Sequence, residues 1–166
     1  GWQLENFRKN PVVLWAHDYG KPPVAKSVNV WIEDGKWYLF YERNDMAIWL
    51  ATSADKLCWK NVQDDPVLPL GPDEYDQAAV AANQIVKSQD KYYMYYHATN
   101  RMDWQDPASP VEWSSNVAMS DDLIHWVKYP GNPIVPGDHS SPILVFDGER
   151  PSLYTMHSEV CRYSPK

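Results

Sequence analysis

The polar and apolar positions along the chain follow a short alternating pattern that is typical of strands. Long helical periodicity is nearly absent, while brief apolar and aromatic runs recur between Gly, Pro and Asp residues. Apolar strands are expected at 27–32, 80–87 and 142–146. The pattern therefore predicts an all-β protein.

An aromatic run follows each of these strands after a tight turn. The segment DGKWYLFY at 34–41 corresponds to QDKYYMYY at 89–96, and a looser copy, DGERPSLY, lies at 147–154. Asp-Gly or Gln-Asp between an apolar run and an aromatic run favours a hairpin. The same pair of strands is therefore predicted three times.

A second repeat lies further along each unit. The segments ATSADKLCW at 51–59 and AMSDDLIHW at 118–126 share the pattern Ser-x-Asp-x-x-x-Trp, and each leads into a Pro-Val or Pro-Ile tail. Asp55 and Asp122 are expected to accept backbone N–H groups in the turn between the third and fourth strands. Trp59 and Trp126 are expected to pack between neighbouring units.

Repeated units of four short antiparallel strands are typical of a β-propeller. The chain is predicted to form one partial propeller domain, 1–166, with about three blades' worth of strands. The units are approximately 14–68, 69–135 and 136–166, the last joined with 1–13. The segment 76–83 is compatible with a short helix, but its register with the first unit favours an innermost strand in its latter half.

Three blades are too few for a closed propeller, which has at least four. The chain is then a piece of a longer enzyme, half of a homodimer that completes the propeller, or an open array. An open array leaves sheet edges exposed to pairing, which disfavours it.

Composition narrows the function classes. The 166 residues carry a net charge of -7 without a block of like charges, which argues against a nucleic-acid partner. No apolar run is long enough for a membrane span, so a soluble chain is expected, whether secreted, periplasmic or cytoplasmic.

Two Cys residues favour free thiols over a disulfide. Nine Trp and eleven Tyr against three Phe suit either sugar stacking or half-solvated sheet faces.

The hairpin repeats and the two Ser-x-Asp-x-x-x-Trp elements resemble those of five-bladed β-propeller glycoside hydrolases and phosphorylases, which include arabinanases, xylosidases, invertases and mannoside phosphorylases. The resemblance covers nearly the whole chain and implies three carboxylates near the starts of innermost strands. It also implies a carbohydrate ligand at a propeller channel. Calcium plugs the channel in some relatives, so the resemblance allows it, but the sequence has no ligand signature for calcium or for another metal or cofactor.

The acids of this chain lie slightly upstream of the expected positions, which hold the neutral residues Ser27, Asn83 and Ser140. Glycoside hydrolysis requires at least two carboxyl groups with different pKa values. The candidate catalytic residues are Asp76, Asp18 and Asp138. Asp73 and Glu74 are candidates for substrate binding, with Glu74 or Asp138 as the proton donor. Alternatively, these acids are solvated loop residues or turn formers.

Further candidates lie where the second strand of each unit ends. Glu42, His97 and His157 occupy corresponding positions and would surround a channel on that side, or they are unrelated polar strand ends. The long insertion 98–115 carries Trp104 and Trp113, which either stack on a sugar ring or cap the propeller edge. The sequence therefore predicts a glycosidase-like protein, with a non-catalytic sugar-binding or protein-interaction propeller as the alternative.

Overall fold

The protein is described by a computed structural model that covers residues 28–43, 46–148 and 150–165. Within these ranges the chain forms strands and connecting loops, as predicted, and no helix. The strands are β1 Asn29–Glu33, β2 Lys36–Glu42, β3 Ile48–Ser53, β4 Lys60–Asn61, β5 Ala79–Ser88, β6 Lys91–Thr99, β7 Ser114–Ser120, β8 Trp126–Lys128, β9 His139–Phe146, β10 Pro151–His157 and β11 Val160–Tyr163. The segment 76–83 enters β5 at Ala79, which confirms the strand interpretation of its latter half.

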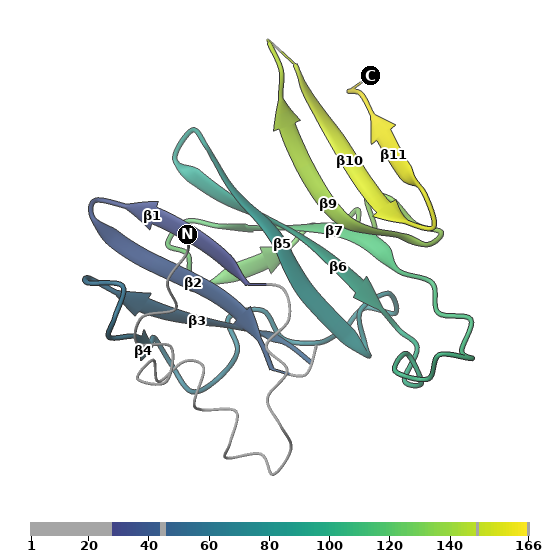
Figure 1. The fold of residues 1–166 in the computed structure, drawn as a ribbon, viewed down its shortest axis with the longest axis horizontal. Coiled ribbons are helices and arrows are strands. Elements are labelled where there is room, and N and C mark those ends of the chain that lie inside the picture. Colours follow the sequence, from purple (N-terminus) through teal and green to yellow (C-terminus); the bar gives the residue numbers. More distant parts are fainter. Residues whose placement is uncertain (1–27, 44–45, 149, 166) are drawn as a thin grey trace, which may run out of the picture.

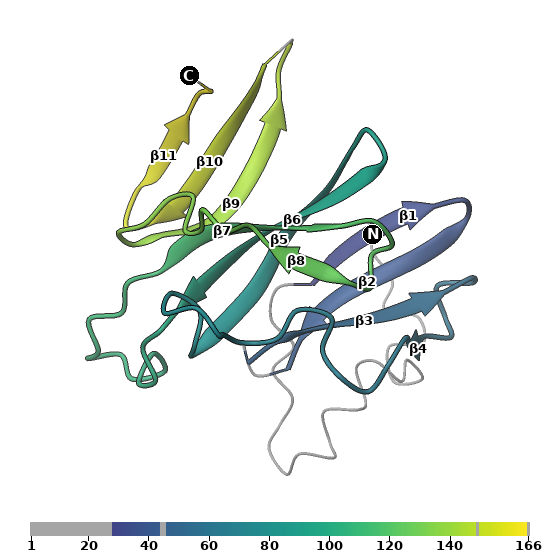
Figure 2. The same ribbon diagram turned by 180° about the vertical axis from the view of Figure 1, so that it is seen from behind.

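The strands form three antiparallel sheets that follow one another along the chain (Figure 1). Two sheets have four strands in the orders β1-β2-β3-β4 and β5-β6-β7-β8, and the third has the order β11-β10-β9. Strand β5 contacts both β1 and β9, so the first strands of successive sheets are neighbours. Figure 2 shows the three sheets from behind, fanning in sequence order. This is the blade arrangement that the repeats predict; the 1–13 part of the last unit lies outside the described residues.

The largest apolar core lies between the first two sheets. Alternate residues of β6 point into it, and Met94 and Tyr96 have no exposed surface. Phe40 of the first sheet packs edge-to-face against Trp126 of the second, with ring centroids 5.8 Å apart. The prediction that Trp126 packs between blades is therefore confirmed. The second and third sheets are joined by a side-chain amide, because Gln84 of β5 both donates to and accepts from the backbone of Leu144 in β9, at 3.0 and 2.6 Å.

The repeated Ser-x-Asp-x-x-x-Trp element forms the same corner in both sheets. Asp55 Oδ1 accepts the main-chain N–H groups of the second and third residues that follow it, at 2.9 and 2.7 Å. Asp122 Oδ1 does the same at 2.9 and 2.8 Å. The indole N–H of Trp59 and that of Trp126 each close the turn on a backbone carbonyl. The predicted role of this element in the turn is confirmed in both copies, and the packing of Trp59 between neighbouring units stays a prediction.

These hydrogen bonds change the acidity of both carboxyl groups. The backbone N–H groups of Cys58 and Leu57 lower the pKa of Asp55 to about 2. Desolvation acts to raise the pKa of Asp122, but the N–H groups of the turn and the His125 side chain outweigh it, so its pKa lies below the ordinary 3.8.

Candidate functional site

Five predicted site residues meet where the second sheet faces the third, and we call them the strand-end cluster. They are His97, Trp104, Trp113, Asp138 and His157. His97 lies near the end of β6, Trp113 directly precedes β7, Asp138 directly precedes β9, and His157 ends β10. In an antiparallel sheet one strand starts where its neighbour ends. The ends of β6 and β10 and the starts of β7 and β9 therefore lie on one side, and residues distant in sequence gather there.

Aromatic rings form one half of the strand-end cluster. The imidazole of His97 meets the indole of Trp113 edge-to-face, with centroids 5.0 Å apart and an interplanar angle of 77°. Trp104 meets the same indole at 5.8 Å and 72°. Trp113 is therefore the shared centre of a small aromatic surface.

A carboxylate joins the aromatic half to the third sheet. Asp138 Oδ1 accepts the backbone N–H of Trp113 at 3.2 Å, and Asp138 Oδ2 lies 2.7 Å from Nδ1 of His157. The next residue, His139, donates its backbone N–H to the Trp113 carbonyl at 2.8 Å. Two hydrogen bonds thus fix the end of the long loop to the start of β9, and a third joins Asp138 to the end of β10.

Two further contacts hold the cluster in place. A bulge in β5 between Ala82 and Gln84 turns the side chain of Asn83 toward His97, where Asn83 Oδ1 lies 2.9 Å from Nδ1. Within the loop, Arg101 pairs with Asp103 through two hydrogen bonds, at 3.0 and 2.9 Å. The Asn83 contact orients the ring of His97, and the Arg101 carbonyl accepts the backbone N–H of Trp104 at 3.1 Å.

The cluster is partly open to solvent. The His157 side chain is 43% exposed and that of Asp138 is 30% exposed, while His97 and both Trp residues are half-buried. Flat apolar rings beside polar edges can hold a ring-shaped ligand that has both C–H and hydroxyl groups. The described residues contain no group of three or more His, Cys, Asp or Glu side chains arranged to hold a metal ion.

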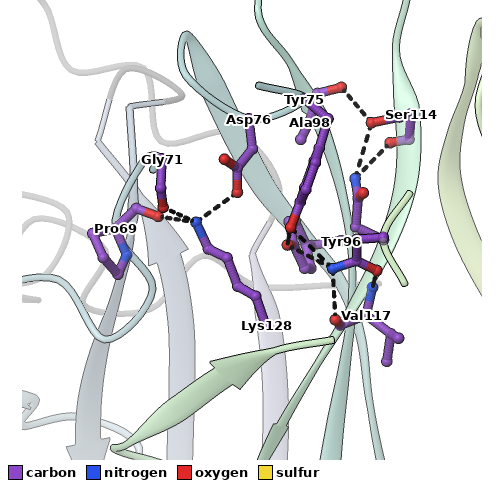
Figure 3. Close-up of polar contacts among 11 residues, drawn as sticks. Pro69, Gly71, Tyr75, Asp76, Tyr96, Ala98, Ser114, Val117 and Lys128 are labelled. Carbon is purple, nitrogen blue, oxygen red and sulfur yellow. Dashed lines mark hydrogen bonds and ion pairs between the residues drawn. The ribbon is translucent and has the colours of Figure 1, made fainter. Parts of the chain in front are cut away.

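Asp76 occupies a different setting, shown in Figure 3. Its side chain has no exposed surface, and Asp76 Oδ2 pairs with Nζ of Lys128 at 2.5 Å. The same ammonium donates to the backbone oxygens of Pro69 and Gly71, at 2.8 and 2.5 Å. Desolvation raises the pKa of Asp76 although Lys128 opposes the rise. Asp76 therefore fastens the segment between the first two sheets to β8, and a role toward substrate stays a prediction.

A neutral network lies beside this ion pair (Figure 3). The hydroxyl groups of Tyr75 and Tyr96 are 3.3 Å apart, and Asn132 Nδ2 donates to both, at 3.1 and 3.2 Å. Asn132 also bonds to the backbone of Val117 in both directions. Desolvation raises the pKa of Tyr96, so its hydroxyl stays protonated. This network is structural.

The other predicted acids lie apart. Glu42 is 1% exposed at the end of β2 in the first sheet, and Asp73 and Glu74 are exposed in the segment before β5. Asp18 lies outside the described residues. None of the sequence patterns indicated the pairing of Lys128 with Asp76 or of Asn83 with His97. Asn83 was visible only as a neutral residue at a position where an acid was expected.

Comparison with known proteins gives relatives that are all named as glycoside hydrolases. No protein-family model matches the chain. An acid beta-fructofuranosidase of Phaseolus vulgaris is 26% identical over 144 residues, which cover 81% of this chain and 20% of the relative. The GH32 beta-fructofuranosidase of Bombyx mori has a TM-score of 0.55 at 17% identity, covering 81% of this chain and 30% of its own.

Two further solved structures have higher TM-scores. A GH43 beta-xylosidase/alpha-arabinofuranosidase from a compost microbial metagenome, in complex with xylotriose and in a calcium-free form, has a TM-score of 0.59 at 15% identity, covering 80% of this chain and 42% of its own. A glycosyl hydrolase of Bacteroides ovatus has a TM-score of 0.64 at 15% identity, covering 87% and 46%.

These comparisons confirm the resemblance that the repeats predict. The chain has the fold of the β-propeller glycoside hydrolases and resembles one of them in sequence. It spans 20% of the length of the curated relative and less than half of each solved relative above.

Proposed function

We propose that this chain belongs to a carbohydrate-active, glycosidase-like protein and binds a glycan at the strand-end cluster. The observation that carries the proposal is the contact of two indole rings, two imidazoles and a carboxylate at one partly exposed place between two blades. The relatives support it, because they include beta-fructofuranosidases and a structure with bound xylotriose.

The chemistry of a sugar matches such a surface. A pyranose or furanose ring has C–H groups that pack on an aromatic face and hydroxyl groups that need hydrogen-bonding partners. Trp104 and Trp113 offer the first, and Asp138 and His157 offer the second. The described geometry therefore favours recognition of sugar rings over recognition of an extended apolar ligand.

Hydrolysis is the part of the proposal that needs another carboxyl group. Two carboxyl groups about 5 to 10 Å apart are required across the scissile bond, and Asp138 is the carboxylate of the strand-end cluster. Glu74, the other predicted donor, lies on the exposed segment before β5. The non-catalytic alternative is favoured by Asp76, because the acid expected to act as the base is in a buried ion pair.

Titration calorimetry with a set of neutral oligosaccharides that includes xylotriose and sucrose tests the binding. Trp113→Ala should weaken binding about fivefold to tenfold or more, because stacking on an aromatic ring contributes roughly 1 kcal/mol or more. Trp37→Ala is the matched control, since Trp37 lies near the start of β2 in the first sheet and Trp113 precedes β7 of the second. Equal losses in both variants, with the fold intact by circular dichroism, would contradict the site.

Turnover separates the two alternatives. A screen of aryl glycosides that shows hydrolysis weakened by Trp113→Ala supports the enzyme, whereas sugar binding without turnover supports the binding module. Either result keeps the strand-end cluster as the sugar site, and the absence of both would reject the proposal.

A homodimer that completes the propeller belongs to the same proposal. The third sheet has three strands, whereas each of the other two sheets has four, and β11 lies at its edge. Val160 of β11 is 69% exposed and Phe146 at the end of β9 is 62% exposed. Exposed strand edges with apolar residues favour pairing with another chain. A monomeric mass by light scattering at high protein concentration would reject the dimer.

A further inference from the structure

The pair formed by Asp138 and His157 has a consequence for how the sugar is held. We propose that Asp138 is a positioning residue and that His157 contacts the ligand, with its Nε2 accepting a hydrogen bond from a hydroxyl group of a neutral sugar. The inference rests on the proposed function for the identity of the ligand. The sequence analysis expected the carboxyl group of Asp138 to act on the ligand directly, whereas this inference assigns the contact to Nε2 of His157.

Both oxygens of Asp138 already have protein partners. Oδ1 accepts the Trp113 backbone N–H at 3.2 Å, and Oδ2 lies 2.7 Å from His157 Nδ1. An ionised carboxylate can only accept hydrogen bonds, so Nδ1 of His157 must carry the proton. In the neutral imidazole Nε2 then has the lone pair and acts as the acceptor. The carboxylate thus selects one tautomer and one orientation of the ring.

The backbone supports a dedicated arrangement. Gly137 and Asp138 both have positive φ, 80° and 65°, which makes the sharp turn into β9. A non-glycine residue in this region is uncommon, although Asp tolerates it better than most. Because β10 pairs with β9 in a register that places His157 opposite His139, this turn brings the carboxylate to the imidazole.

The neighbouring groups distinguish His157 from the other imidazole at this edge. His139 lies opposite in the β9–β10 register, but its Nδ1 is 3.4 Å from Thr155 Oγ1 and its ring packs 6.1 Å from that of Tyr163. His157 instead pairs with the carboxylate that also holds the Trp113 backbone. Its side chain is more exposed than that of Asp138, 43% against 30%. The imidazole is therefore the more accessible partner for a sugar.

A related arrangement occurs at the other imidazole of the strand-end cluster. Nδ1 of His97 lies 2.9 Å from Asn83 Oδ1, and its ring meets the Trp113 indole. Both imidazoles are thus held at Nδ1 by a side-chain oxygen, and the carboxylate that holds His157 also accepts the Trp113 backbone N–H. Asn83 could be turned by exchange of its amide atoms, whereas the carboxylate of Asp138 has no donor form when ionised. His157 is consequently the position at which the tautomer is determined.

The arrangement also selects the class of ligand. A hydroxyl donates to Nε2, while a sugar carboxylate brought to the same place would face the negative charge of Asp138 and would find an acceptor in place of a donor. We therefore expect neutral oligosaccharides to bind and the corresponding uronates to bind at least tenfold more weakly.

The tautomer can be measured without any ligand. Long-range ¹H–¹⁵N correlation spectra of the imidazoles, recorded as pH rises until the rings are neutral, should show His157 protonated at Nδ1. Asp138→Ala should lose this tautomer preference, and Ser158→Ala, an exposed neighbour, should keep it. A wild-type ring protonated at Nε2 would overturn the inference. If Asp138→Ala does not fold, Asp138→Asn, which keeps an acceptor for the Trp113 backbone, is compared in its place.

The binding arm uses the tightest neutral oligosaccharide from the set that includes xylotriose and sucrose. His157→Ala should weaken binding about tenfold, and His157→Gln, whose amide can reach the position of Nε2, should recover part of the loss. If His157→Ala binds the sugar as tightly as the wild type, this inference is overturned and the proposed function stands. No binding of any probe by the wild type overturns both.

Discussion

Replacement of Lys128 by Met tests how much the ion pair with Asp76 contributes to stability. The substitution keeps the length of the side chain but removes the ammonium that donates to Asp76 and to two backbone carbonyls. Asp76 has no exposed surface and Lys128 is 12% exposed, so water cannot replace the lost donor easily. Removal of one partner from a buried pair costs about 3 to 5 kcal/mol, and we expect a loss of about 3 kcal/mol at pH 7.

We expect the lower end of that range because Asp76 can take up a proton when its partner is lost, which removes the unpaired buried charge. Burial already raises this pKa above 3.8, and Lys128 acts to lower it, so the variant should raise it further. A carboxyl group whose folded pKa is raised stabilises the fold below its unfolded value and loses that contribution as pH rises through the folded value. The variant should therefore be less destabilised at pH 5 than at pH 8.

Urea unfolding followed by Trp fluorescence measures the effect. The matched control is Lys91→Met, because Lys91 pairs with Asp121 at 2.6 Å but the two side chains are 44% and 76% exposed. An exposed pair contributes at most about 1 kcal/mol. The double variant of Lys128→Met with Asp76→Asn should regain stability over Lys128→Met alone. Equal losses for Lys128→Met and Lys91→Met, or a double variant as unstable as the single one, would refute the reasoning.

Two further predictions concern the blade architecture. Gln84→Ala removes both bonds to the Leu144 backbone, so the Leu144 amide should exchange hydrogen faster and stability should fall by roughly 1 to 2 kcal/mol. Replacement of the exposed Gln105 by Ala should change neither quantity. An unchanged Leu144 exchange rate in Gln84→Ala would count against the contact. The lowered pKa of Asp122 gives stability that is present above 3.8 and is lost as pH falls through the folded value. Asp122→Asn should flatten the fall in melting temperature between pH 5 and pH 2, whereas Asp121→Asn should leave the slope as in the wild type.

The sequence predicted the parts of the fold that depend on local pattern. The hairpins at 34–41 and 89–96 follow from alternating side chains and a turn with positive φ, found at Asp34 and Gln89. The corner at Asp122 follows from hydrogen bonds between residues two and three positions apart. Such interactions are encoded within a short segment, so a single sequence contains enough information to identify them.

The contacts of the strand-end cluster could be predicted only in part, because the interactions that form them are not local. His157 and Asp138 were identified from their places in the repeat and Trp113 from the long insertion, but only the β9–β10 register and the turn at Gly137 bring them together. Asp76 was expected to lie at an open channel, because its partner Lys128 is 52 residues away and no pattern links them. Exposure and ion pairing depend on packing between blades, which a single sequence does not determine.

The most direct test of the strand-end cluster as a sugar site is to follow the indole N–H signals during a titration with neutral oligosaccharides. The nine Trp residues of the chain each contribute one such signal. We predict saturable shifts for Trp104 and Trp113, and none for Trp59 and Trp126, whose indole N–H groups are bonded to the corner carbonyls. Saturable shifts confined to other Trp residues, with Trp104 and Trp113 unmoved, would contradict the account.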